Sequence, residues 1–165
     1  MGTRNLTKVI DRNGKTVVAQ YGQWDGYPAG QGVNALYHLH NLNAIESNLS
    51  KCHFLSESEI ENVNSILSAS EKPIFDLYPT LSRDIGADVL GYIAYATHQI
   101  PLTDNSDFEK DTTFCEAVYT VDFQNNWFIA EWNYKRFVWD FDKLPTKEAF
   151  LEAFELEKAH EPTLI

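Results

Sequence analysis

The chain has 165 residues, of which 44% are hydrophobic and 13% aromatic, values typical of one folded domain spanning residues 1–165. Its formal net charge of −11 excludes general binding of nucleic-acid backbones, because an acidic surface repels phosphates. No apolar run in the sequence approaches the roughly 18 residues that a membrane span needs.

The acidic charge leaves two functions open: a local basic pocket for a small anion, and mimicry of nucleic acid in a partner's groove. Cys52 and Cys115 form neither a CxxC motif nor a short metal-ligand spacing. Because no signal peptide precedes them, we expect reduced thiols in a cytoplasmic protein. We expect no metal and no cofactor.

The first predicted element is a β-hairpin over NLTKVIDRNGKTVVAQY, residues 5–21. Apolar residues flank a turn at Asp11–Gly14, in which the pair Asn13-Gly14 tolerates positive φ. The hairpin runs straight into the stretch QYGQWDGYPAGQG, at residues 20–32. A helix is predicted to begin near Gly30–Gly32, because apolar residues then recur at helical spacing.

Two more helices are predicted before a polar loop at residues 99–112. Ser56 and Glu59 form a capping box at the start of the first of them. Ser82 is the expected N-cap of the second, which covers SRDIGADVLGYIAYA. The apolar stripes are formed by Ile60, Val63 and Leu67 in the first helix and by Ile85, Val89 and Ile93 in the second.

The last third of the chain is predicted to be mostly β. FCEAVYTVDF and WFIAEWNY alternate around a turn at residues 124–126, RFVWDF is a candidate third strand, and a helix follows from about Thr146 to Ala159. Its inward-facing residues are Phe150, Leu151 and Phe154. This order predicts an α+β fold, with an antiparallel sheet built from the N-terminal and C-terminal hairpins and covered by helices.

Residues 20–32 combine aromatic rings, amides and flexible backbone, which suits a nucleotide-like ligand. A base or another planar ring is expected to stack on the side chains of Tyr21, Trp24 and Tyr27. The residues expected to bind its polar edge are Gln20, Gln23 and Asp25.

An anionic part of the ligand is expected at the helix start. Free backbone N–H groups at Gly30 and Gly32 would face a phosphate or carboxylate there. Arg4 and Arg83 are the expected cations, because arginine binds such groups in bidentate fashion. The glycine spacing matches neither GxGxxG nor GxxxxGK[ST].

A purely structural interpretation of the same residues stays open. The three rings then cover the end of the core, Arg83 pairs with Asp84 or Asp88, and Arg4 is solvated. His38 and His40 would point about 200° apart on a helix, so they do not share a metal ion.

The segments MGTRNLT and QYGQWDGYP resemble those of an uncharacterised family of short bacteriophage and prophage proteins. LSRDIGADVL and FCEAVYTVDF also look like later blocks of that family, so the resemblance covers most of the chain. It implies a phage context, in which short proteins often counter host defence by binding a nucleotide signal or a defence protein. It supplies no catalytic residue.

Three functions are therefore considered. The first is a phage protein of the host cytoplasm that binds a nucleotide-like or anionic small molecule, as a monomer or a homo-oligomer. The second is an acidic inhibitor that binds a host defence protein. The third is a hydrolase, because the element order resembles that of N-terminal nucleophile hydrolases; it would require cleavage after Gly2 to expose Thr3. No GxSxG or HExxH motif occurs, which favours binding over catalysis.

Overall fold

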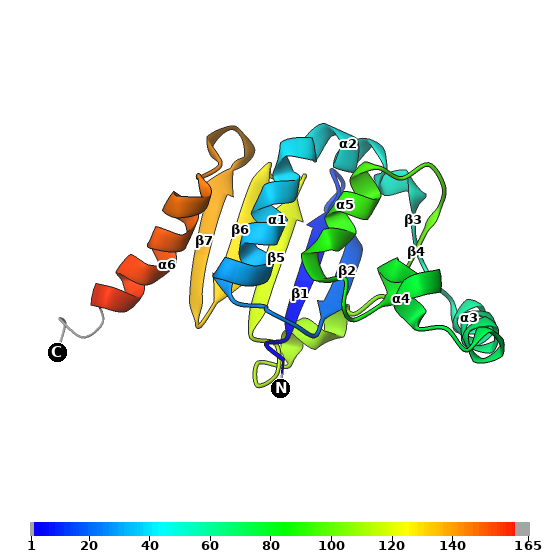
Figure 1. Ribbon diagram of the computed structural model, residues 1–165. Helices are drawn as coiled ribbons and strands as arrows, with labels where there is room; N and C mark the ends of the chain where they lie inside the picture. The colour runs from blue at the N-terminus through cyan, green and yellow to red at the C-terminus, as the bar shows by residue number, and fades with distance from the viewer. Residues whose placement is uncertain (1, 161–165) are drawn as a thin grey trace.

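The computed structural model describes residues 2–160 and contains a five-stranded sheet with helices packed on one face (Figure 1). The strands are arranged in the order β2-β1-β5-β6-β7. Every pairing in this sheet is antiparallel except the one between β1 and β5. The predicted α+β fold is therefore confirmed, and a parallel contact joins its two hairpins. The strands are β1 (Asn5–Ile10), β2 (Thr16–Gly22), β5 (Ala117–Asp122), β6 (Trp127–Trp132) and β7 (Lys135–Asp140).

Both predicted hairpins are present, and an aspartate stabilises the turn of each. Between β1 and β2, the Asp11 carboxylate accepts hydrogen bonds from the backbone N–H groups of Asn13 and Lys15 at 2.9 and 3.0 Å. Gly14 takes the positive φ of this turn, at +81°. The Asp122 carboxylate accepts two backbone N–H groups of the turn that follows β5. Short side chains that accept bonds from the residues just after them favour such turns.

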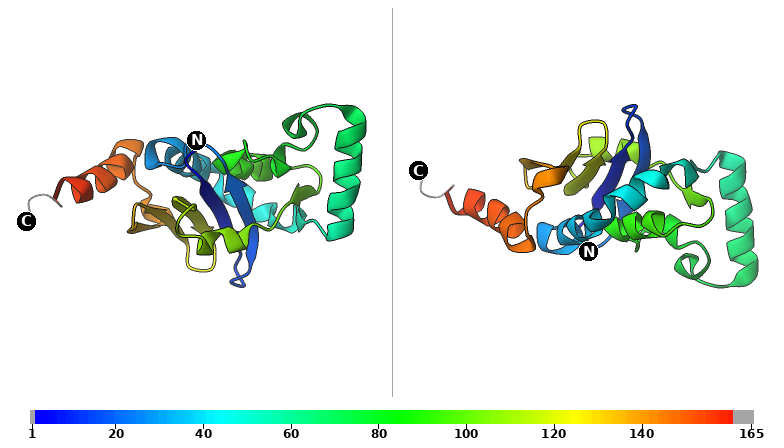
Figure 2. Two further views of the ribbon diagram at one scale, coloured as in Figure 1. Left: turned by 90° about the horizontal axis from the view of Figure 1, so that it is seen from below. Right: turned by 90° about the horizontal axis from the view of Figure 1, so that it is seen from above.

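Four helices cover one face of the sheet: α1 (Val33–His38), α2 (Leu42–Ser47), α5 (Val89–Ala94) and α6 (Lys147–His160) (Figures 1 and 2). The core lies between these two layers. From the strands it includes the buried residues Val9, Val18, Tyr119, Val121 and Phe128, and from the helical layer Leu39, Ile45, Ile85, Val89, Leu90, Ile93, Phe150 and Phe154. The residues predicted to face inward after Ser82, Ile85, Val89 and Ile93, are buried. In the last helix, Phe150 and Phe154 are buried as predicted and Leu151 is half-buried.

The predicted helix over SRDIGADVLGYIAYA is shorter and begins later than expected. The chain first forms a 3₁₀ turn, η5 (Gly86–Asp88), and only then α5. Gly86 has a φ of +52°, which interrupts a right-handed helix. The helix expected to begin near Gly30–Gly32 is present: a π-helical turn, η1 (Pro28–Gly32), leads directly into α1.

An arm extends from one end of the molecule (Figure 2). It is formed by α3 (Glu57–Ser70) and α4 (Ile74–Leu77), and a two-stranded parallel ribbon, β3 (Cys52–Phe54) with β4 (Ile100–Leu102), connects it to the body. The predicted capping box starts α3: the backbone N–H of Ser56 donates to Glu59 Oε1 at 2.9 Å, and that of Glu59 donates to Ser56 Oγ at 3.3 Å. No residue of α3 is buried, so its apolar stripe does not join the core.

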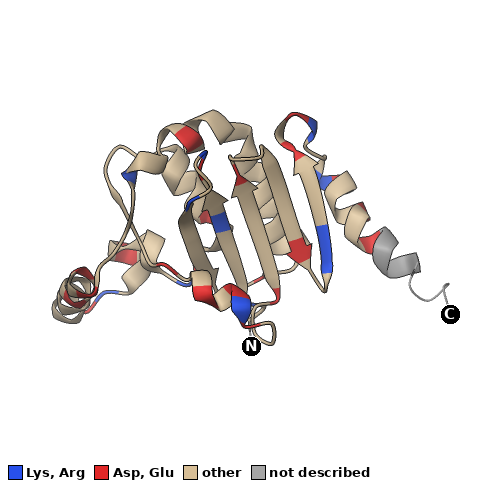
Figure 3. Ribbon diagram, turned by 180° about the vertical axis from the view of Figure 1, so that it is seen from behind, with Lys and Arg blue, Asp and Glu red and all other residues tan. Residues whose placement is uncertain are grey.

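On the opposite face of the sheet, a 3₁₀ segment, η6 (Ser106–Lys110), lies over one end of strands β1 and β2 (Figure 3). Phe108 packs against Tyr21 with ring centroids 4.9 Å apart, and Glu109 pairs with Lys8 at 3.1 Å. None of the helices within residues 2–160 has both the length and the apolar character required to cross a membrane.

Candidate functional site

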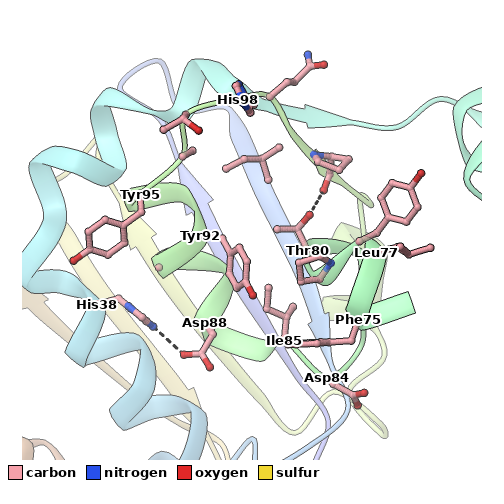
Figure 4. Close-up of a pocket in the computed structure, with 18 residues that line it drawn as sticks. His38, Phe75, Leu77, Thr80, Asp84, Ile85, Asp88, Tyr92, Tyr95 and His98 are labelled. Atoms are coloured by element: carbon pink, nitrogen blue, oxygen red, sulfur yellow. Dashed lines mark hydrogen bonds and ion pairs between the residues drawn. The ribbon is translucent and has the colours of Figure 1, made fainter. Parts of the chain in front are cut away.

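A cavity of about 800 Å³ opens on the helical side of the molecule, between α1, α4 and α5 (Figure 4). We call it the α5 groove. Its lining comes from segments far apart in the sequence, and α5 crosses its centre. The lining residues are His38, Phe75, residues 77–80, Asp84, Ile85, Asp88, Gly91, Tyr92 and residues 95–101.

The side chains that line the α5 groove are mainly aromatic and apolar. Phe75, Tyr92 and Tyr95 are exposed by 42%, 43% and 75%, and Tyr78 is half-buried. Tyr92 and Tyr95 point away from the sheet because the same helix turns Val89 and Ile93 into the core. In the view of Figure 4, Tyr92 lies between the pair His38–Asp88 and the side of the groove formed by Phe75 and Thr80. The groove therefore offers several ring faces to a ligand.

Two carboxylates line the same groove, and each is oriented by protein donors through one oxygen. Asp88 Oδ1 lies 2.9 Å from His38 Nε2 and accepts a hydrogen bond from Asn34 Nδ2 at 3.0 Å. Asp84 Oδ1 accepts the indole N–H of Trp24 at 2.6 Å. Among residues 2–160, no hydrogen bond reaches the second oxygen of either carboxylate. Both acids thus retain an acceptor for a ligand.

The position of His38 depends on a glycine of α5. A Cβ atom added to Gly91 would lie 2.8 Å from His38 Cε1, closer than side-chain carbons approach. The missing side chain lets the imidazole cross α5 and reach Asp88, so that the ring of His38 closes one side of the groove.

Three of the residues predicted to bind a ligand lie at the edge of the groove. The Gln23 backbone N–H donates to the Arg83 carbonyl at 2.9 Å, which joins the end of β2 to the segment before Asp84. The Arg83 guanidinium carbon lies 5.9 Å from the Trp24 ring centroid. The structure therefore brings Gln23, Trp24 and Arg83 together, next to a carboxylate of the groove.

Three further predicted residues, Asp25, Tyr27 and Gly30, lie in one loop whose polar groups bond to each other. The Tyr27 hydroxyl donates to Asp25 Oδ1 at 3.2 Å, and the negative charge of Asp25 raises the pKa of Tyr27. The Gly30 backbone N–H donates to the Tyr27 carbonyl at 2.9 Å, and that of Gln31 donates to the Asp25 carbonyl at 2.7 Å. These two N–H groups at the helix start are therefore already paired within the loop.

The other four predicted residues point elsewhere. Gln20 is buried against the Ser82 carbonyl, to which its Nε2 donates at 3.3 Å. Tyr21 follows it in the strand and so faces the opposite side of the sheet, against Phe108. Arg4 lies over the ring of Phe114, 4.7 Å from its centroid, and Gly32 is buried beneath Phe150 and Tyr119. The structure does not gather the ten predicted residues around one cavity.

Sequence reasoning missed the residues at the centre of the groove. Tyr92 and Tyr95 lie three positions apart, on the side of the predicted helix opposite its apolar stripe. Two aromatic residues on the outward side of a short helix were the available signal. Asp88 and His38 gave no local signal, because their contact joins residues 50 positions apart.

The two cysteines lie outside the groove. Burial raises the pKa of the Cys52 and Cys115 thiols to about 11, so both are protonated at neutral pH and weakly nucleophilic.

Within the groove, the Thr80 hydroxyl donates to the Pro101 carbonyl at 2.7 Å. The geometry thus supports binding of a ring by aromatic faces and carboxylate acceptors.

Comparison of the chain with protein-family models, with curated proteins and with solved structures found no match.

Proposed function

We propose that this protein binds a small nucleotide-like molecule, with the planar base in the α5 groove. The observation that supports this proposal is the exposure of Tyr92, Tyr95 and Phe75 around one cavity of about 800 Å³. Pockets for small molecules typically measure about 300–1,000 Å³ and combine apolar walls with a few polar groups. Stacking of a base on an aromatic side chain contributes about 1–3 kcal/mol, which makes such rings effective binding surfaces.

Arg83 offers a cation to an anionic tail of the ligand at the edge of the groove. Arg83 precedes Asp84 in the chain and lies over Trp24, whose indole contacts the same carboxylate. We expect a phosphate to lie beside Arg83 and outside the groove, since the groove itself is acidic.

The biological role that we propose is sequestration of a nucleotide signal used in host defence. This role rests on the resemblance of the chain to short phage proteins, and it places the protein in the cytoplasm of an infected host. A binding protein that lowers the free concentration of a signal needs binding groups and no catalytic residue.

Native mass spectrometry followed by calorimetric titration tests the proposal. The freshly purified protein is examined for a bound small molecule, and then titrated with nucleosides and nucleotides. Replacing Tyr92 and Tyr95 together by alanine is expected to weaken binding about tenfold or more, because both ring faces are lost. Tyr134→Ala removes a fully exposed tyrosine outside the groove and is the matched control. Unchanged affinity in the double variant would refute the proposed site.

A second candidate, an acidic inhibitor of a host defence protein, is favoured by the arm. Helix α3 contains Glu57, Glu59 and Glu61 and no basic residue, and Ile66 on the same helix is 41% exposed. Such a surface is complementary to a basic, partly apolar partner. The complex would weaken steeply with salt, survive replacement of Tyr92, and be lost when Glu57 and Glu61 are both changed to lysine.

A further inference from the structure

The polar half of the α5 groove has a definite chemical preference. We infer that the groove selects a planar group whose edge donates at least two N–H hydrogen bonds, and that it discriminates against anionic rings. This inference rests on the proposed function, because it concerns the ligand of the same groove.

The charge of the lining is the first argument. Among the described residues that line the groove, the carboxylates are Asp84 and Asp88, the second of which contacts His38, and neither Lys nor Arg is present. The surrounding rings add to this preference, since the face of an aromatic ring is electronegative and attracts positive or N–H edges. An anionic group placed inside the groove would face both carboxylates, and no Lys or Arg side chain among the described lining residues would compensate its charge.

The hydrogen-bonding state of the two carboxylates is the second argument. In each, one oxygen is occupied by a protein donor, from His38 and Asn34 for Asp88 and from Trp24 for Asp84. These contacts hold the carboxylates in place while the second oxygens accept no bond from the described residues. Together the two carboxylates offer acceptors and no donors, which favours a ligand with two N–H donors, since an ionised carboxylate can only accept.

The chemistry of such an edge occurs in two kinds of small molecule. Guanine presents adjacent N–H donors on a neutral ring, and an amidinium group presents them on a cation. Inosine has the guanosine ring with one donor position removed, and xanthosine has the same ring but is largely anionic at neutral pH. The four compounds therefore separate stacking, donor number and charge.

The experiment is a calorimetric titration at pH 7.5 and 0.15 M salt with guanosine, inosine, xanthosine and benzamidine. Guanosine is expected to bind about tenfold more tightly than inosine, because a hydrogen bond to a charged group is lost, and xanthosine is expected to bind most weakly. Tighter binding of benzamidine would show that the groove prefers a cationic amidinium group. Tighter binding of guanosine would show that it prefers a neutral nucleobase. The inference is supported if guanosine or benzamidine binds more tightly than both inosine and xanthosine.

Two variants test the carboxylates directly. Asp84→Asn and Asp88→Asn retain the shape of each side chain but place a donor where the ligand needs an acceptor, so each is expected to weaken binding about tenfold. Asp142→Asn, at an exposed aspartate in the turn after β7, is the control. Thermal unfolding of each variant shows whether the fold is retained, and the Asp84 variant keeps the His38–Asp88 pair intact.

The outcomes separate this inference from the proposed function. If xanthosine binds as tightly as guanosine and benzamidine, or if neither aspartate variant weakens binding, the donor preference is refuted. The proposed function survives that result as long as binding still depends on Tyr92 and Tyr95. If none of the four compounds binds, the donor preference is refuted, and failure of the nucleotide titration as well would refute the proposed function.

Discussion

Trp24 holds two segments together through a single side chain. Its indole N–H donates to Asp84 at 2.6 Å, while the guanidinium of Arg83 lies over its ring. The side chain is still 43% exposed. Trp24 therefore orients an acid of the groove and leaves part of its ring at the edge of the same cavity.

A glycine in the neighbouring loop provides a prediction at this scale. A Cβ on Gly30 would lie 2.2 Å from the Asp25 carbonyl oxygen, which accepts the Gln31 N–H. Because backbone atoms must move to make room, Gly30→Ala is expected to lower the free energy of unfolding by about 1–3 kcal/mol. Urea denaturation measures the loss. The control Ala29→Gly changes an exposed neighbour and is expected to cost about 1 kcal/mol or less. A Gly30→Ala protein as stable as the parent would contradict the close packing of this loop.

Single residues also show why the predicted site differs from the observed groove. Gln20 and Tyr21 were assigned to one ligand, but β2 continues to Gly22, so the two side chains lie on opposite faces of the sheet. Trp24 and Arg83 were proposed from the sequence because an aromatic ring and a guanidinium suit a nucleotide-like ligand, and the structure places the two side chains together. Asp88 and His38 could not be paired from the sequence, since their contact depends on how α1 packs beside α5.

At the scale of secondary-structure elements, the capping box of α3 is both predicted and sensitive to pH. Glu59 accepts the backbone N–H of Ser56 and lies 2.9 Å from His53 Nε2. The backbone bond from Ser56 is the main cause that lowers the pKa of Glu59 to about 2, and the His53 side chain adds to it. A lowered pKa means that the ionised carboxylate of Glu59 is more stable in the folded protein than in the unfolded chain.

The resulting prediction concerns the first turn of α3. Its stabilisation by Glu59 is fully present above the ordinary pKa of 4.5 and is lost as the pH falls through about 2. Hydrogen exchange of the α3 amides, corrected for intrinsic rates, should show weaker protection at pH 3 than at pH 5. Glu59→Gln keeps a side-chain acceptor and should remove this pH dependence, whereas Glu57→Gln in the same turn should retain it. Equal protection at both pH values in the parent protein would be inconsistent with the capping box.

Elements that depend on local contacts could be predicted, and those that depend on distant contacts could not. The Asn13-Gly14 turn, the capping box and the strand alternation near residue 120 all involve neighbours in the sequence. The parallel pairing of β1 with β5 and of β3 with β4 joins residues far apart, and no local pattern specifies a partner. The prediction of a single helix after Ser82 was wrong because Gly86 takes a positive φ, which the pattern of apolar residues does not reveal.

At the scale of the whole molecule, the charge is the dominant feature. The net charge is −11 and the isoelectric point is about 4.7. Figure 3 shows acidic residues on strands, turns and the arm rather than on one element. Mutual repulsion of these charges opposes the compact state, and dissolved ions screen it.

We therefore expect salt to stabilise the folded protein at pH 7.5. Raising sodium chloride from about 0.02 to 0.3 M, which shortens the screening length to below roughly 10 Å, should raise the Tm by about 2–4 °C. Differential scanning calorimetry measures the shift. At pH 5, near the isoelectric point, the same addition should have a much smaller effect. A Tm that falls with salt at pH 7.5 would mean that ion pairs outweigh the repulsion.

The position of β1 in the sheet affects how a new chain is made. Asn5 pairs with Ala117, 112 positions later, so most of the chain must be synthesised before β1 obtains its second neighbour. Until then, the first hairpin presents the unpaired edge of a strand that contains Leu6 and Val9, and such an edge readily pairs with other chains. Closing so long a loop is also slow. The nascent chain is therefore more prone to aggregation than the finished molecule, in which β5 covers that edge.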